Sequence, residues 1–413
     1  MKINIDPVIS SRIRYAWQAL SPDQRNRIAP ILARANQQVM AVVQSRVAPI
    51  FDPDIPHQAV LARSALDNDL DGVLSNLEAG VVIDVDAAGQ IWGTGKYQQL
   101  DPGWAETAAV WLENLTSRHA FNSNPGTITI PDSLQIAIAG DWGTGDWRTA
   151  SNPAPSTDVA RHIAFLQPHL TIHLGDVYYA GTTEQEQHLL VNLWLKGSLG
   201  ALTLNSNHEM YSGATPYFKD ALNSDLFALQ RGCSYFALEN SRWVIVGLDS
   251  AYYSDAEKLY MEGSLYPDGG PPAQLDFLKT QVAKGKKVIV LSHHNGLSED
   301  GSSPTRLWPQ VMSAFPDGAG PAYWYWGHVH AGVVYRPYGP ANVLCRCGGH
   351  GAVPWGQADM LAKSSNVEWY EKRSARDPDI PERVLNGFTV LRLDGSDLKE
   401  IFYDENGGIA WES

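Results

Sequence analysis

The sequence is poor in cysteine, in basic residues and in long apolar runs. Only 3 of its 413 residues are cysteine, too few for a disulfide framework in a chain of this size. Lys and Arg number 31 against 45 Asp and Glu, a formal net charge of −14, and no basic run of the kind that binds nucleic-acid polymers is present. No apolar run approaches the ~18 residues that span a bilayer. We therefore expect neither a nucleic-acid polymer as partner nor a membrane span.

The N-terminal residues and the cysteines give a prediction about location. The stretch MKINIDPVISSRIRYAW contains Asp6 and Pro7 and lacks the apolar core of a secretory signal. Together with the few cysteines, this predicts a cytoplasmic protein. Cys345 and Cys347 stand two apart in VLCRC, on one face of an expected strand. Because further soft ligands are missing nearby, we interpret them as ordinary strand positions.

The first 130 residues are predicted to form a mainly helical region. A helical pattern over 9–48 contains SPDQ, which resembles a capping box with proline at the first helical position. Further helices are expected at about 58–78 and 103–116, and a hairpin over 81–95 turns at Ala88 and Gly89. The turn-rich segment 121–132 is the predicted boundary, so the two units are 1–130 and 131–413. The apolar stripe of the first region needs a partner surface, which favours a lid over the site or an oligomer contact. Its positions are Ile28, Ile31, Leu32, Ala35, Val39 and Val42.

From residue 134 onward, short apolar strands end in polar, glycine-flanked clusters. The strands are 134–140, 169–175, 201–206, 286–292 and 322–327, with helices expected at 156–167, 183–196, 272–283 and 305–315. Alternating strands and helices predict parallel βαβ units, and apparent hairpins at 234–249, 331–347 and 387–403 make the sheets mixed. The fold class is therefore α/β. In such sheets, ligands bind beyond the carboxyl ends of the strands.

Side chains able to bind metal follow these strand ends. Carboxylate, imidazole, phenolate and amide oxygen are donors suited to Zn, Mn and Fe. Seven candidates are more than one tetrahedral zinc needs, and two metals bridged by one carboxylate would use them all. Two cations ~3.5–4 Å apart clamp a phosphoryl group, so hydrolysis of a phosphate ester is the reaction that fits best. The candidate ligands are Asp141, Asp176, Tyr179, Asn207, His293, His328 and His330.

Five ordered blocks within 134–350 resemble the motifs of calcineurin-like metallophosphoesterases. They read GDWG (140–143), GDVYY (175–179), SNHE (206–209), VLSH (290–293) and GHVH (327–330). In detail they are similar to the purple acid phosphatase branch, because Gly143 replaces the histidine usual in the first block and Tyr179 stands where that branch supplies a tyrosine. The alternative places Tyr178 there, with Tyr179 in an aromatic wall. The resemblance implies a four-layer α/β/β/α sandwich; residues 1–130 do not resemble the β-sandwich that precedes plant members.

The resemblance also implies a role for each candidate. The first metal would be bound by Asp141, Asp176, Tyr179 and His330, and the second by Asp176, Asn207, His293 and His328. Asp176 would bridge, a metal-held hydroxide would attack phosphorus in line, and His208 would bind the phosphate and protonate the leaving oxygen. The expected pair is Fe(III) with Zn, Mn or Fe(II), with two zinc or two manganese ions as the alternative. Ser206 stands where the family usually has glycine.

The sequence leaves undecided the roles of two histidines and the class of phosphate ester. His294 is a substrate contact or a structural hydrogen-bonding group, and His350, among the glycines of CGGHG, either contacts substrate or does not take part. The predicted function is a binuclear hydrolase of small phosphorylated substrates, with phosphomonoesters first. The alternative is a phosphodiesterase acting on cyclic nucleotides, nucleotide diesters or phospholipid head groups. A third hypothesis is a non-catalytic metal-binding interaction protein.

Overall fold

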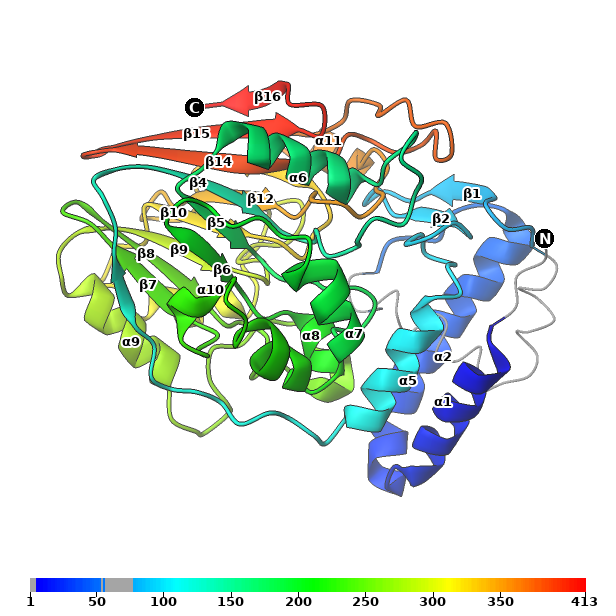
Figure 1. Cartoon of the computed structure of the whole chain (residues 1–413). Helices are drawn as coiled ribbons and strands as arrows, with labels where there is room; N and C mark the ends of the chain where they lie inside the picture. Colours follow the sequence, from blue (N-terminus) through cyan, green and yellow to red (C-terminus); the bar gives the residue numbers. More distant parts are fainter. Residues whose placement is uncertain (1–4, 53–54, 56–76) are drawn as a thin grey trace.

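The computed structural model describes residues 5–52, 55 and 77–413 and contains two large mixed β-sheets (Figure 1). The first sheet has eight strands in the order β13 (Val367–Tyr370), β11 (Gly332–Tyr335), β12 (Leu344–Gly348), β10 (Tyr323–Trp326), β9 (Lys287–Ser292), β8 (Trp243–Leu248), β7 (Phe236–Glu239) and β3 (Thr127–Thr129). The second has six strands in the order β16 (Ile409–Glu412), β15 (Asp397–Asp404), β14 (Gly387–Asp394), β4 (Ser133–Ala139), β5 (Leu170–His173) and β6 (Gly200–Thr203).

The two sheets pack face to face, and helices cover their outer faces. Alternate residues of each strand point to opposite faces, so Ile136 and Ile138 of β4 enter the core between the sheets, where Ile289 of β9 also lies. Behind the six-stranded sheet lies α6 (Pro155–Leu166), and behind the eight-stranded sheet lie α9 (Ala273–Val282) and α10 (Leu307–Met312). This arrangement confirms the predicted four-layer α/β/β/α sandwich.

The predicted parallel strands and hairpins are present. Strands β4, β5 and β6 are parallel neighbours, as are β8, β9, β10 and β12. The predicted hairpins correspond to the antiparallel pairs β7–β8, β11–β12 and β14–β15. The helix predicted at 183–196 is instead α7 (Thr183–Gln185) followed by a π-helical segment, η1 (Glu186–Val191). Short elements without a clear sequence signal are α8 (Asn207–Tyr211), η2 (Tyr217–Ala221), η3 (Ala228–Gln230), η4 (Ala256–Lys258) and α11 (Asp359–Lys363).

The N-terminal region contains α1 (Pro7–Ala19), α2 (Pro22–Ser45), the hairpin of β1 (Val82–Val85) and β2 (Ile91–Gly93), and α5 (Trp104–Asn114). The predicted helix 9–48 is therefore two helices, because Ser21 and Gln24 form the capping box that starts α2. The predicted stripe is buried except for Ile31, which is only half-buried. Nearly all of the helix predicted at 58–78 lies outside the described residues. No helix among those described is both long and apolar enough to cross a bilayer.

The N-terminal helices lie along one side of the sandwich and share its core (Figure 1). Trp104 and Trp111 of α5 are fully buried in the same apolar cluster as Tyr178 and Tyr211. The indole nitrogen of Trp111 donates to the carbonyl of Ala256 at 2.8 Å. The segment 121–132 contains β3, which pairs with β7 of the large sheet. The division into 1–130 and 131–413 stays a prediction.

Candidate metal centre

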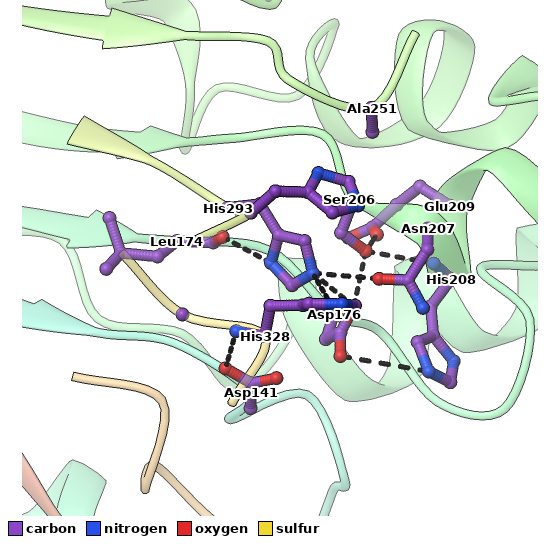
Figure 2. Close-up of polar contacts among 12 residues, drawn as sticks. Asp141, Leu174, Asp176, Ser206, Asn207, His208, Glu209, Ala251, His293 and His328 are labelled. Atoms are coloured by element: carbon purple, nitrogen blue, oxygen red, sulfur yellow. Dashed lines mark hydrogen bonds and ion pairs between the residues drawn. The ribbon is translucent and has the colours of Figure 1, made fainter. Parts of the chain in front are cut away.

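The candidate ligands come together at the carboxyl ends of the central strands. Asp141 follows β4, Asp176 follows β5, and Asn207 begins α8 after β6. From the other sheet, His293 follows β9 and His328 follows β10. Figure 2 shows these side chains pointing toward one another, with Asp176 in their midst. The rule that ligand sites lie beyond the carboxyl ends of parallel strands therefore located the cluster correctly.

The backbone at three of these residues is held in a rarely populated conformation. Asp141, Asp176 and His328 have φ angles of 57°, 81° and 65°. For residues with a Cβ, the left-handed region costs on the order of 1–3 kcal/mol and is found mostly where function requires it. Asp141 is further fixed by the backbone N–H of His328, which donates to its Oδ2 at 2.9 Å. The site is thus preorganised by its own backbone.

One group of donors gathers around Asp141. His330 Nε2 lies 3.2 Å from Asp141 Oδ1 and 4.0 Å from Asp176 Oδ2. The hydroxyl of Tyr178 lies 2.7 Å from Asp176 Oδ2, 3.4 Å from Asp141 Oδ1 and 3.1 Å from His330 Nε2. Asp141, Asp176 and His330 are close enough to share one metal ion, and all three are buried. The hydroxyl oxygen of Tyr178 adds a fourth donor atom.

A second group gathers on the other side of Asp176. His293 Nε2 lies 3.3 Å from Asp176 Oδ1, 2.8 Å from Asn207 Oδ1 and 3.2 Å from His328 Nδ1. The other ring nitrogen of His293 lies 2.9 Å from the carbonyl oxygen of Leu174, which favours the hydrogen on Nδ1 and leaves the Nε2 lone pair directed at the cluster. Asp176 Oδ2 faces the first group and Oδ1 the second, as a bridging carboxylate requires.

The protonation states of the buried groups fit metal binding. Burial lowers the pKa of His293 and of His330 to about 3 and that of His328 to about 4, so these imidazoles are neutral, as metal ligands must be. Burial and the neighbouring Asp176 raise the pKa of Asp141 well above its usual value. Burial opposes the charge of Asp176, but His208 and His293 outweigh it and hold its pKa well below the usual value. A cation between the two carboxyls would let both ionise.

The tyrosine that faces the carboxylates is Tyr178, and the structure places Tyr179 outside the cluster. The hydroxyl of Tyr179 donates to Asp101 Oδ2 at 2.5 Å, and its ring packs edge-on against Trp104 with centroids 4.9 Å apart. Both partners come from the N-terminal region. Tyr179 therefore belongs to an aromatic wall, and the alternative that placed Tyr178 among the ligands agrees with the geometry. Sequence spacing alone could not show which of these two adjacent tyrosines faces the carboxylates.

His208 turns one ring nitrogen toward the centre. Its Nδ1 lies 2.7 Å from the carbonyl oxygen of Tyr179, which fixes the hydrogen on Nδ1. Its Nε2 lies 3.7 Å from Asp176 Oδ2, and the ring packs against that of Tyr178 with centroids 4.4 Å apart. The same Tyr179 carbonyl accepts the hydroxyl of Thr107 at 3.0 Å, so α5 of the N-terminal region contributes to the position of His208.

Ser206 causes no strain where the family usually has glycine. Its φ of −135° is open to any residue, and its side chain caps α8 by accepting the His208 N–H at 3.0 Å. Its Oγ also contacts Asp176 Oδ1, at 2.5 Å, and Glu209 Oε2. A hydroxyl has one hydrogen, and burial raises the pKa of Glu209 to about 8, so Glu209 donates to Ser206 and Ser206 donates to Asp176. The serine thus orients the carboxylate of Asp176.

The remaining candidates lie beside the centre. His294 lies close enough to His293 and His328 for the three to share a metal ion. Its Nδ1 is 2.9 Å from Ser250 Oγ and its Nε2 is 2.7 Å from the carbonyl oxygen of Tyr260, so hydrogen bonds within the protein engage both nitrogens. His350 is buried beside a cavity of about 10 Å³ that His330 also lines, room for one water molecule. Cys345 and Cys347 are buried core residues of β12, as interpreted from the sequence.

A cleft of about 680 Å³ opens onto His328 and His330. Ile31 and Arg34 of α2 line it on the side away from the sheets, and so do Phe51 and Asp52. The N-terminal region therefore lies beside the mouth of the site, and its role as a lid or an oligomer contact stays a prediction. None of these residues carries a motif. The one signal that could have singled out Ile31 is its position at the edge of the apolar stripe.

Comparisons with known proteins agree with the site in its general chemistry. Residues 134–332 match the family model described as calcineurin-like phosphoesterase. The search of curated proteins gave no significant match.

Among solved structures, similar chains include GAP50, described as the anchor in the inner membrane complex of Plasmodium (14% identity, TM-score 0.46, 68% of this chain and 88% of that one). Others are a dimetal phosphatase from Danio rerio (12%, 0.40, 66% and 95%) and an uncharacterized predicted phosphoesterase from Streptococcus pneumoniae (11%, 0.28, 68% and 96%).

Proposed function

We propose that this chain is a binuclear metal-dependent hydrolase of phosphate esters, with monoesters as its first substrates, because residues 134–332 match the calcineurin-like phosphoesterase family model. The observation that carries the proposal is the position of Asp176. Its two oxygens face separate donor groups, one with Asp141, Tyr178 and His330 and the other with Asn207, His293 and His328.

The donor sets match borderline and hard cations, because they combine carboxylate, phenol, amide oxygen and neutral imidazole. Two such cations would neutralise phosphoryl oxygens and lower the pKa of bound water. Residues of the chain would hold the metals, shield the site and transfer the proton. Asp141 and Asp176 would hold the metals, and the buried Tyr178–Trp104 side of the site would shield them from solvent. His208, with its hydrogen on Nδ1, presents Nε2 toward the site, where in its protonated form it hydrogen-bonds the phosphate and passes a proton to the leaving oxygen.

The purple acid phosphatase type of first site belongs to the same proposal, with Tyr178 in the place given to Tyr179. Burial raises the pKa of the Tyr178 hydroxyl well above its usual value, and Asp176 and Asp141 add to the effect. A phenolate therefore forms there only against a strong Lewis acid, which favours Fe(III) over zinc or manganese. Zn, Mn or Fe(II) would complete the pair.

A colour test separates the two tyrosines. Protein loaded with iron under oxidising conditions is expected to absorb visible light by phenolate-to-iron charge transfer, and Tyr178→Phe is expected to abolish that band. Tyr179→Phe is the matched control, because it removes only the hydroxyl that contacts Asp101. Absorption spectra of both variants at equal iron content make the measurement. A band that survives in Tyr178→Phe and disappears in Tyr179→Phe would contradict the assignment.

A phosphodiesterase is the second candidate, and the size of the cleft favours it. About 680 Å³ beside His328 and His330 is enough for a second ester substituent. The two functions are separated by comparing turnover of p-nitrophenyl phosphate with that of bis-p-nitrophenyl phosphate, on protein whose bound metals have been quantified. Faster turnover of the monoester is expected. Preference for the diester would establish the second candidate, and no turnover of either by metal-loaded protein would refute a hydrolase.

A further inference from the structure

The cleft that opens onto the metal centre has walls from two parts of the chain. One wall belongs to the sandwich and the loops that follow its strands, and the other to α2 and the residues after it. The sandwich side includes Met261, Glu299, Arg306 and Trp355, together with His328 and His330. The other side comprises Ile31, Arg34, Phe51, Asp52 and Ile55.

The α2 wall is held in place by specific contacts. Arg27 forms two hydrogen bonds with the carboxylate of Glu257, at 2.5 and 2.6 Å. Glu257 lies in η4, next to Ala256, which accepts the indole N–H of Trp111. The loop that continues from η4 reaches the metal centre, where the carbonyl of Tyr260 contacts His294. The segment 257–260 therefore contacts both α2 and a histidine beside the metal centre.

The lining is apolar at several positions and nearly balanced in charge. Ile31, Phe51, Ile55, Met261 and Trp355 give it apolar surface, and three of these five lie in the N-terminal region. A pocket of ~300–1,000 Å³ with apolar walls and a few polar groups is the usual shape of a small-molecule site.

The cations of the cleft have acidic neighbours. Arg34 pairs with Asp52 at 3.9 Å, Lys258 with Glu262 at 3.4 Å, and Arg306 with Asp268 at 2.8 Å. Burial, next to Asp86 and Asp300, raises the pKa of Glu299 to about 8, so this carboxyl is mostly protonated at neutral pH. The cleft therefore has little excess charge with which to attract a second anionic group.

We propose that this cleft binds the organic part of the phosphoester, that α2 determines its specificity, and that the substrate is a monoester of a bulky, uncharged alcohol or phenol with an apolar body. This inference rests on the proposed function, since the phosphate itself is assigned to the metal centre. Ile31 is the specificity-determining residue on α2, because it departs from the buried stripe and faces the cleft. An ester with a small alcohol reaches the metals without touching α2.

The test compares Ile31→Trp, which narrows the cleft, with Gln37→Trp, which adds the same ring at an exposed position of α2 that does not line it. The expected result is a fall of about 10-fold or more in kcat/KM for 1-naphthyl phosphate relative to methyl phosphate in Ile31→Trp. Gln37→Trp is expected to leave that ratio as in the wild type. Ile31→Gln, which makes the position polar without adding a ring, is the second variant and is expected to shift the ratio in the same direction.

Binding of non-hydrolysable phosphonates separates this inference from the proposed function. Calorimetry with metal-loaded protein is expected to show tighter binding of naphthylmethylphosphonate than of methylphosphonate, and Ile31→Trp is expected to remove the difference. Equal affinities in the wild type, or an equal loss for both ligands in Ile31→Trp and Ile31→Gln, would overturn the cleft assignment. Selective phosphonate binding without turnover of any ester would support the cleft and count against the hydrolase.

Discussion

Replacing Asp176 with asparagine is expected to abolish activity and binding of both metals together. Its two oxygens face the two donor groups, and a neutral amide can neither carry the charge nor bridge. A metal supplies several kcal/mol of transition-state stabilisation, and each ~1.4 kcal/mol is tenfold in rate, so a loss of about 10³-fold or more is expected. Metal analysis after dialysis, with kcat/KM on p-nitrophenyl phosphate, makes the measurement.

Thermal unfolding gives this variant a second readout that does not depend on turnover. Metal ions are expected to raise the midpoint of the wild type, because they bind the folded state only, and to leave that of Asp176→Asn unchanged. Asp158→Asn on the outer helix α6 is the control for a lost carboxylate and is expected to respond like the wild type. Full metal content in Asp176→Asn would show that the carboxylate does not bridge.

His208→Ala is expected to slow hydrolysis by about 10²–10⁴-fold, the usual contribution of a general acid. The loss is expected to be largest for alkyl phosphates, whose leaving oxygen is basic, and smallest for nitrophenyl phosphate, whose leaving group needs no proton. Turnover of the two esters by one preparation checks this. His188→Ala, an exposed histidine of η1, is the control. An equal loss on both esters would assign His208 to phosphate binding alone.

The strand ends were predictable from the sequence because the pattern there is local. Each apolar run is short and stops at a polar residue, and parallel strands place those residues at one edge of the sheet. The hairpins were predictable for a similar reason, since alternation and turn residues lie within a few positions of each other. Asp141, Asp176, His293 and His328 could therefore be grouped without a structure.

The features that the sequence did not resolve depend on contacts between distant segments. Tyr178 and Tyr179 are adjacent, and what separates them is the hydrogen bond from Tyr179 to Asp101, 78 residues away. The hydrogen-bond partners of His294 are Ser250 and Tyr260, which lie 44 and 34 residues away, so its sequence neighbours do not reveal them. The pattern of α2 predicted its buried face, but the position of Ile31 beside the cleft depends on how the helix is docked. Each of these features depends on how distant segments pack together, and the residues nearby in the sequence do not indicate it.

The shared core of the N-terminal helices and the sandwich has a consequence for cooperativity. Trp104 and Trp111 are buried in one cluster with Tyr178 and Tyr211, and Tyr178 in turn contacts the bridging carboxylate. A foldon is a set of residues that opens and closes as one, and these contacts assign α5 and the metal-binding loops to the same foldon. The candidate metal centre is thus as rigid as its link to the helices, and we expect substitutions on α5 to affect this centre through shared packing.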